Sequence, residues 1–410
     1  MNQKTKDTQQ IVFVILIGLS FCHFLNDMMQ SLLAAIYPML KENYCLNFSQ
    51  IGMLTMSFQV TASILQPLIG FYTDKRPLPY ILFAGMSATL LGLLLLASST
   101  SYLSLLIGAS CIGLGSAVFH PDASRVARMA SGGHHGLAQS LFQVGGNLGT
   151  AIGPLLAAFI VLPRGQDSLS WFSLAALLGM AILWKIGHWY KHNCTIKQKY
   201  KNTTAFLVSP KQVKIALSAL CVLMFSKFLY TVSLSSYYTF YMIHKFHISV
   251  QEAQVYLFIF LASVAVGTLI GGPIGDKFGR KWVIWISILG VLPFTLILPY
   301  ASLYWTKVLT ILIGLIISSA FSAIVVYGQE LVPHRIGTIS GIFFGFAFGI
   351  SGLGAAALGG LADLKGIDFV FHVCSYLPAL GLFAGFLPDI KQQELSEDDV
   401  EEIQETIGNA

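Results

Sequence analysis

The sequence predicts an all-α membrane protein with twelve transmembrane helices in two six-helix bundles related by a pseudo-twofold axis. Three observations carry this prediction: an apolar composition, twelve apolar runs of membrane-spanning length, and a repeat that relates the two halves. Of the 410 residues, 55% are hydrophobic and only 10% are charged, and the mean hydropathy is +0.70. These values lie far from those of soluble domains.

The apolar runs follow one another with mostly short loops between them. A hydrocarbon core about 30 Å thick needs roughly 20 residues per helical crossing. The runs lie near 11–37, 49–72, 79–99, 102–121, 138–160, 169–190, 213–242, 251–275, 282–300, 307–329, 336–362 and 367–387. No cleavage-site signature follows the first run, so we expect it to remain as a membrane helix.

The basic residues test this helix assignment, because positive charge collects on the cytoplasmic side of membrane proteins. With the N-terminus placed inside, most of the 24 lysines and arginines fall in cytoplasmic segments. The exceptions are Lys41, Arg164, Lys245, Lys307 and Lys365 outside, and Lys227 within a span. We therefore expect cytoplasmic N- and C-termini. The net charge of +5 follows this topology and gives no reason to invoke nucleic acid.

Composition divides the chain into four segments. Residues 1–190 are expected to form the first bundle, 191–212 a basic cytoplasmic linker, 213–387 the second bundle, and 388–410 an acidic cytoplasmic tail. The tail is expected to be solvated, and a regulatory role for it remains open.

A repeat supports the two halves. Gly70-x-x-x-Asp74 recurs 202 residues later as Gly272-x-x-x-Asp276, each time at the end of an even-numbered run. Duplication of this kind places a substrate site between the halves, near the bilayer midplane.

These residues carry a family resemblance. The stretch GGPIGDKFGRK at 271–281 resembles the loop signature of the major facilitator superfamily, whereas the first copy, GFYTDKRPLPY, has Pro77 in place of the second glycine. More narrowly, the chain resembles the fosmidomycin resistance protein family of bacterial efflux transporters. The stretches that carry this resemblance are HFLNDMMQSLLAAIYP, VFHPDASRVARMASGGHHGLAQS, FQVGGNLG, SSYYTFY, LILPYAS and FGFAFG.

The resemblance implies a twelve-helix transporter of the bacterial inner membrane that exports the phosphonate antibiotic fosmidomycin in exchange for protons. One departure concerns the fourth helix, where many drug exporters of the superfamily carry R-x-x-Q-G-x-G. The matching segment here, ASCIGLG, keeps only Gly113 and Gly115, so an arginine-based proton relay is unsupported there.

One polar stripe interrupts the first apolar run. His23, Asn26, Asp27 and Gln30 share one helical face. An ionised carboxylate at mid-bilayer costs about 2.5–3.5 kcal/mol, so Asp27 must face a wet cavity, meet a partner or carry a proton. We expect Asp27 and His23 to couple transport to protons; a carboxylate that only ties two helices together is the alternative.

Lys227 is the only basic residue deep in a span. Under the repeat it falls opposite Leu25, close to Asp27 in the paired helix. The first and seventh helices are therefore expected to present opposite charges to one central cavity. Lys227 could form a salt bridge with Asp27 or receive a phosphonate through charge-assisted hydrogen bonds.

Other polar residues at helical spacing are further candidates for substrate contacts, although such stripes are often only packing. The candidates are Asn26, Gln30, Tyr230, Ser233, Tyr237, Gln143, Asn147 and His120. His120 precedes Pro121 at the expected inner end of the fourth helix, where a helix-ending and gate-facing role is favoured over metal ligation. No histidine or cysteine spacing is typical of a metal site, and no cofactor is expected.

A final set of residues is expected to serve gating. Gly149-x-x-x-Gly153-Pro154 matches part of the superfamily's antiporter motif: small residues permit close helix approach, and the proline kinks the helix. The loop residues expected to latch the two halves at the cytoplasmic face are Gly70, Asp74, Gly272, Asp276 and Arg280.

The function expected from the sequence is a monomeric, proton-coupled antiporter that exports small anionic phosphonates. Its partners are the anion, protons and the lipid bilayer. Two alternatives stay open: transport of an endogenous phosphorylated or carboxylated metabolite, and uncoupled facilitation. An enzyme is excluded because the sequence shows no nucleophile and base pair, no phosphate loop and no metal cluster.

Overall fold

The structure, a computed structural model, describes residues 11–46, 48–198 and 209–388, and every regular element in these ranges is helical. The first half contains α1 (Phe13–Ala35), α2 (Tyr37–Asn43), α3 (Phe48–Lys75), α4 (Ile81–Ala97), α5 (Tyr102–Ala130), α6 (His135–Leu156), η1 (Ala157–Val161), α7 (Leu162–Arg164), η2 (Gln166–Phe172) and α8 (Ser173–Gln198). The second half contains α9 (Pro210–Phe246), α10 (Val250–Phe278), α11 (Arg280–Ile288), α12 (Leu292–Ile297), η3 (Leu298–Tyr300), α13 (Leu303–Leu331), α14 (Ile336–Lys365), α15 (Ile367–Cys374) and η4 (Leu377–Phe386).

Most of these elements can cross a membrane. Among the described residues, 10 helical segments are long and apolar enough, counting η2 with α8, α11 to η3, and α15 with η4 as single segments. The two remaining predicted runs are α4, with 17 residues, and α6, which continues into the π-helical η1. The predicted all-α membrane fold is confirmed.

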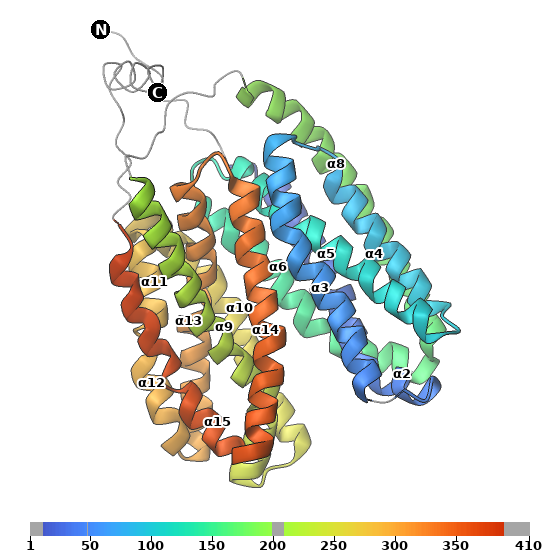
Figure 1. The fold of residues 1–410 in the computed structure, drawn as a ribbon, viewed down its shortest axis with the longest axis vertical. Coiled ribbons are helices and arrows are strands. Elements are labelled where there is room, and N and C mark those ends of the chain that lie inside the picture. The colour runs from blue at the N-terminus through green and yellow to red at the C-terminus, as the bar shows by residue number, and fades with distance from the viewer. Residues whose placement is uncertain (1–10, 47, 199–208, 389–410) are drawn as a thin grey trace.

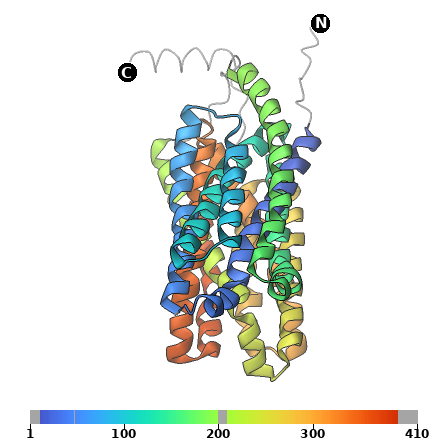
Figure 2. The same ribbon diagram turned by 90° about the vertical axis from the view of Figure 1, so that its right-hand side faces the viewer.

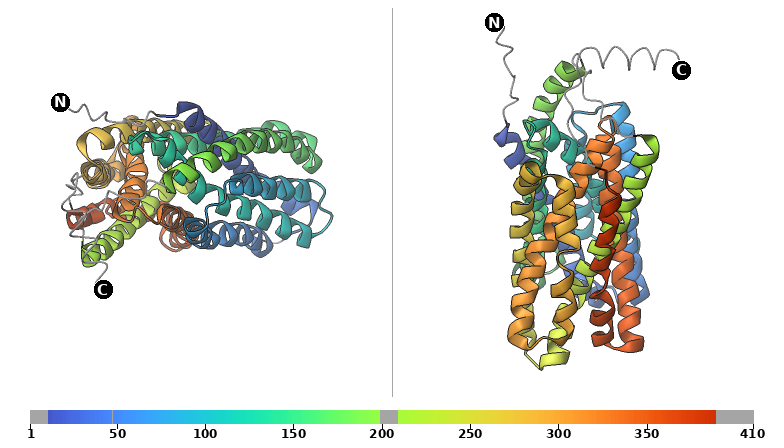
Figure 3. Two further views of the ribbon diagram at one scale, coloured as in Figure 1. Left: turned by 90° about the horizontal axis from the view of Figure 1, so that it is seen from above. Right: turned by 90° about the vertical axis from the view of Figure 1, so that its left-hand side faces the viewer.

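The helices gather into two groups that meet near one end and diverge toward the other (Figure 1). We call α1 to α8 the N-terminal bundle and α9 to η4 the C-terminal bundle. Viewed from above, the two bundles lie side by side (Figure 3), and viewed from the side the N-terminal bundle stands in front of the other (Figure 2). Between the bundles, α3 packs on α14 and α6 packs on α10, which reflects the repeat.

The division into residues 1–190, 191–212, 213–387 and 388–410 stays a prediction. Residues 199–208 of the predicted linker and 389–410 of the predicted tail lie outside the described residues.

The fourth predicted run is longer than expected. The apolar pattern ends at residue 121, but α5 continues through Pro121 to Ala130. The added turns contain buried charges that find partners, since Arg125 donates to Asp122 at 2.7 Å and to Asp74 at 2.6 Å. The prediction that His120 ends this helix is therefore wrong, because paired charges allow the helix to continue beyond the apolar run.

The two loop signatures end their helices differently. Gly279 has φ +95 after α10, in the left-handed region that favours glycine, which accounts for the second glycine of the signature. In the first copy, α3 ends at Lys75, and the loop then passes through Pro77 without a glycine.

Candidate functional site

A cavity of about 210 Å³ lies between the two bundles. Its walls come from α1, α5 and α6 on one side and from α9, α10, α13 and α14 on the other. The ionisable and amide side chains that line it are His23, Asp27, His120, Gln143, Asn147 and Lys227. Asp27 and Lys227 therefore face one central cavity from opposite bundles.

A wider cavity of about 490 Å³ continues from this one. The two share Asp27, Thr150 and Phe348, and the wider one runs along α1 past Gln30 to Ala35. Asp27 thus stands at the junction between a narrow inner cavity and a wider outer one.

A larger groove of about 640 Å³ lies on the outer face of α10, α11 and α13. Its walls are apolar or small side chains such as Ile270, Trp282 and Ser319, with no charged side chain. An anion would find no counter-charge there, so we place the functional site in the central cavity.

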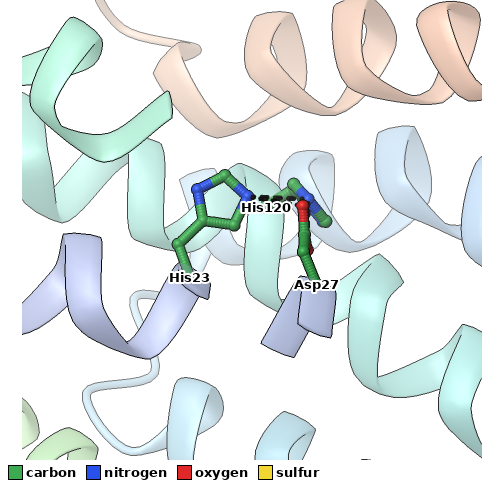
Figure 4. Close-up of side chains that lie close together, drawn as sticks. All are labelled: His23, Asp27 and His120. Carbon is green, nitrogen blue, oxygen red and sulfur yellow. Dashed lines mark hydrogen bonds and ion pairs between the residues drawn. The ribbon is translucent and has the colours of Figure 1, made fainter. Parts of the chain in front are cut away.

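Asp27 lies beside the imidazoles of His23 and His120 (Figure 4). Its Oδ2 lies 3.2 Å from His23 Nε2, and its Oδ1 lies 3.6 Å from His120 Nε2. The amides of Asn26 and Gln30 also donate to Oδ1, at 3.1 Å and 3.4 Å. These contacts hold the carboxylate in place beside the cavity.

The two histidines are held from behind by backbone carbonyls. His23 Nδ1 donates to the carbonyl oxygen of Phe142 at 2.7 Å. His120 Nδ1 lies 2.9 Å from the carbonyl oxygen of Ser116 and 3.3 Å from its hydroxyl. The Nε2 atoms lie 3.3 Å apart and both approach Asp27. We call His23, Asp27 and His120 the polar cluster.

One donor atom from each residue of the polar cluster lies within 4.8 Å of the others, so a cation could be held between them. A dication in that position would face the Lys227 ammonium across the same small cavity. We therefore favour the smaller charge of a proton. Chain spacing gave no sign of this cluster, because His120 comes from a different helix.

Lys227 carries a buried positive charge without an anionic partner. The residue is 6% exposed, and its ammonium lies 4.3 Å from the ring centre of Phe228 and 5.3 Å from that of Phe321. Among the described residues no carboxylate forms an ion pair with it, so the salt bridge to Asp27 is not made in this conformation. Cation–π contacts contribute about 2 kcal/mol when desolvated, less than the several kcal/mol that burying an ion costs.

Two α6 amides complete the polar wall. Gln143 and Asn147 line the cavity one helical turn apart. Asn147 donates to Thr268 Oγ1 at 3.2 Å, whereas Gln143 Oε1 is buried with no hydrogen-bond partner among the described residues. Both side chains are available to a cargo in the cavity.

The structure places three of the seventh-helix candidates away from the cavity. Ser233 donates to the carbonyl of Tyr230 at 2.7 Å, and the Tyr237 hydroxyl donates to the carbonyl of Ala355 at 2.5 Å. The Tyr230 ring packs within the C-terminal bundle. The face of α9 that lines the cavity carries Lys227 and Thr231 instead.

The glycines of α6 lie against α1. A Cβ added at Gly149 would lie 2.2 Å from the Phe24 carbonyl oxygen, and one at Gly153 would lie 1.7 Å from Ser31 Oγ. At Gly146 it would lie 2.4 Å from His23 Nε2 and 2.8 Å from Asp27 Oδ2. The glycine series thus brings α6 directly behind the polar cluster. Pro154 lies in α6, but its side chain is outside what the structure describes.

Asp74 joins the bundles at the end of α3. Its carboxylate accepts from the backbone N–H groups of Gly337 at 2.9 Å and Thr338 at 2.6 Å, at the start of α14. It also pairs with Arg125 of α5. A carboxylate at a helix N-terminus interacts favourably with the helix dipole.

Asp276 forms the equivalent contact at the end of α10. It accepts from the N–H groups of Gly136 at 2.8 Å and Leu137 at 2.9 Å, at the start of α6. Arg280 bridges Asp276 at 2.8 Å and Glu330 at 3.2 Å. The two carboxylates, related by the repeat, thus cap helices of opposite bundles.

Glycine pairs let these helix ends approach. A Cβ at Gly70 would lie 2.1 Å from the Gly337 carbonyl oxygen, and one at Gly272 would lie 2.2 Å from that of Gly136. The start of α1 lies at this same end, since Val12 N–H donates to Ala130 at 2.9 Å. We call it the closed end; the wider cavity lies farther along α1, away from it.

Sequence reasoning missed the aromatic and hydroxyl residues of the cavity wall. They are Thr150, Phe228, Thr231, Thr268, Ser318, Phe321, Phe344, Phe348 and Ser351. Phe344 and Phe348 lie in the stretch FGFAFG that carries the family resemblance, but helical spacing alone does not distinguish these residues from packing residues of other membrane helices.

The sequence profile of the Major Facilitator Superfamily matches residues 19–210 and 215–409. The Fosmidomycin resistance protein of Escherichia coli (strain K12) is 56% identical over 384 residues, which cover 93% of this chain and 94% of that protein. The Uncharacterized MFS-type transporter YfnC of Bacillus subtilis (strain 168) is 43% identical over 381 residues, covering 92% and 93%.

Among solved structures, the transporter FucP in the outward conformation superposes with a TM-score of 0.72 at 17% sequence identity. The match covers 92% of this chain and 99% of FucP. At this identity the likeness concerns the fold alone.

Proposed function

Because the chain belongs to the major facilitator superfamily and, within it, to the fosmidomycin resistance protein family, we propose that it exports small anionic phosphonates in exchange for protons. It is a multi-pass membrane transporter and not an enzyme. The observation that carries the proposal is the buried ammonium of Lys227, which faces the same cavity as Asp27 and lacks a carboxylate partner in the described part of the chain.

The anion binds at Lys227. A charge-assisted hydrogen bond contributes about 1.5–3 kcal/mol, and a phosphonate offers several acceptor oxygens. The Gln143 and Asn147 amides add donors from the opposite bundle, so a bound anion bridges the two bundles. The cavity of about 210 Å³ is smaller than most drug-sized pockets and suits a small cargo.

The proton binds at Asp27 and its imidazole neighbours. The 13% exposed carboxylate stands where the wider cavity meets the narrow one, so a proton can reach it without crossing packed protein. Intramembrane ionisable groups of this kind mark proton pathways in transporters.

Whether the anion and the proton cross the membrane in the same or in opposite directions depends on which ligand-bound forms of the cavity reorient. A proton near Asp27 and an anion at Lys227 attract each other, so within one conformation each favours the other. Exchange therefore requires that the cavity reorients with either ligand alone, but not when it is empty or holds both. In this cycle the anion moves outward and the proton returns inward as the bundles rock about the central cavity.

The closed end faces the cytoplasm in this proposal. Lys75, Arg76, Lys277 and Lys281 follow the two latch carboxylates there, and positive loops lie on the cytoplasmic side. The N- and C-termini are then cytoplasmic and the membrane is the bacterial inner membrane. One chain supplies the whole cavity, so a monomer suffices.

The test is fosmidomycin flux in proteoliposomes under an imposed pH gradient, with the membrane potential clamped. The clamp matters because the potential alone favours export of an anion by about 2.3 kcal/mol per charge per 100 mV. We expect fosmidomycin to move in the direction opposite to the protons, toward the more acidic side of the membrane. Flux that ignores the gradient would indicate a facilitator, and transport of phosphorylated or carboxylated metabolites without fosmidomycin would change the cargo.

A further inference from the structure

The hydrogen-bond pattern of the two histidines indicates where their protons lie. A carbonyl oxygen only accepts, so His23 Nδ1 must carry a hydrogen to bond Phe142. His120 Nδ1 lies closer to the Ser116 carbonyl, at 2.9 Å, than to the Ser116 hydroxyl, at 3.3 Å, and we assign it a hydrogen for the shorter contact. A neutral imidazole carries one hydrogen in total. With this assignment, both neutral histidines present a bare lone pair at Nε2.

These two lone pairs point into the same small space. The Nε2 atoms are 3.3 Å apart and lie 3.2 Å and 3.6 Å from the Asp27 oxygens. The histidines are 2% and 1% exposed. Three electron-rich groups would then repel one another with no hydrogen between them, and burial makes this costly.

One added proton removes the conflict. Placed between the two Nε2 atoms, it converts a repulsive contact into an N–H···N hydrogen bond, and the Asp27 carboxylate balances the resulting charge. The amides of Asn26 and Gln30 still donate to that carboxylate, which therefore stays ionised.

We propose that His23 and His120 share one proton between their Nε2 atoms and that this is the coupling proton. The inference rests on the proposed function and deepens it, because it moves the proton from the Asp27 carboxylate to the histidine pair. His120 then binds the proton, in place of the substrate contact expected from the sequence. The site takes one proton per cycle.

The placement of the charges explains how rocking could act on this proton. His23, Asp27 and His120 all belong to the N-terminal bundle, on α1 and α5, so rocking leaves the polar cluster intact. Lys227 belongs to the C-terminal bundle and moves relative to the cluster. Its positive charge opposes the shared proton by an amount that depends on the conformation.

No other charged group lines this cavity among the described residues. The neighbouring α6 contributes Gln143, Gly146 and Asn147; α14 contributes Phe344 and Phe348; α10 and α13 contribute hydroxyl, aliphatic and aromatic side chains. Asp27, His23, His120 and Lys227 are thus the titratable groups that determine the charge of the site.

The first test is ¹⁵N NMR of the full-length protein labelled at histidine. We expect one imidazolium signal near neutral pH that disappears in both His23→Gln and His120→Gln. His188→Gln is the matched control, since His188 Nδ1 also bonds the carbonyl four residues earlier, Trp184 at 3.1 Å, but the residue is exposed. Two neutral histidines in either tautomer, including a His120 that accepts from Ser116 and carries its hydrogen on Nε2, would overturn the inference, as would a stoichiometric metal ion in the purified protein.

The second test is fosmidomycin flux under a clamped potential. We expect fosmidomycin flux by His120→Gln to lose its response to the pH gradient, whereas flux by His188→Gln keeps that response. If wild-type flux follows the gradient and that of His120→Gln follows it equally, the inference fails and the proposed function stands. If wild-type flux ignores the gradient, the proton-coupled function itself fails. Should His120→Gln not fold, His23→Gln and the wild-type NMR spectrum decide.

Discussion

Replacing Lys227 by methionine should make the ligand-free protein more stable and abolish anion transport. The substitution keeps a long, flexible side chain but removes a buried charge that has no carboxylate partner in the described structure. A lysine with only a structural role would give the opposite result, a loss of stability with anion binding kept, so the pair of outcomes is diagnostic.

The magnitudes follow from the contacts. Burying an ion costs several kcal/mol, and the contacts with Phe228 and Phe321 return about 2 kcal/mol. We therefore expect Lys227→Met to raise the free energy of unfolding of the ligand-free protein by about 1–3 kcal/mol. Losing a charge-assisted hydrogen bond of about 1.5–3 kcal/mol should weaken fosmidomycin binding about 10- to 150-fold.

The assay is thermal unfolding in detergent with and without fosmidomycin, together with a direct measurement of Kd. Lys245→Met is the matched control: it lies on the same helix, outside the cavity, and its ammonium bonds the Tyr241 hydroxyl at 2.9 Å and the carbonyl of Pro299 at 2.5 Å. The control should lose stability and keep its affinity. A Lys227→Met protein that is less stable than wild type, or that binds fosmidomycin unchanged, would refute the reasoning.

Three further substitutions probe the cluster, the glycine face and the latch. Asp27→Asn removes the counter-charge of the histidine pair, so the pair should bind its proton about 10- to 1,000-fold more weakly. The measurement is fosmidomycin flux as a function of external pH, and the variant should need a more acidic exterior than wild type. An unchanged pH profile would contradict this. Gly146→Ala should abolish flux because its Cβ would displace His23 and Asp27, whereas Gly349→Ala, with nothing within 4 Å, should leave flux near wild type. Asp74→Asn should loosen the closed end by about 1.5–3 kcal/mol per lost charged hydrogen bond. The readout is the labelling rate of Ser124→Cys in a cysteine-free protein, because Ser124 is buried between the bundles and accepts from Gln329 at 3.0 Å; we expect faster labelling, and unchanged labelling would argue against the latch.

The fold was predictable because each membrane helix corresponds to a local apolar run in the sequence, and the signatures at Gly70 and Gly272 indicate the repeat. The length of α5 was not, because its last turns contain charges. Asp122 and Arg125 lie beyond the end of the apolar run but still within the helix, because Arg125 forms ion pairs with Asp122 and with Asp74 at the closed end.

The site was predictable only in part. Helical spacing gives the angle between side chains on one helix but not the direction in which the helix faces. For this reason Lys227 reaches the cavity while Ser233 and Tyr237, on the same helix, do not. The contact between His23 and His120 joins residues of different helices and arises only when α1 and α5 pack around α6.

The central claim is that an anion on one bundle and a proton on the other cross the membrane in opposite directions through one cavity. The most direct measurement loads proteoliposomes with fosmidomycin and records internal pH as the anion leaves, with the membrane potential clamped. We expect the interior to acidify in step with fosmidomycin efflux, and Lys227→Met to abolish both signals. Efflux at constant internal pH, or with alkalinisation of the interior, would contradict the exchange.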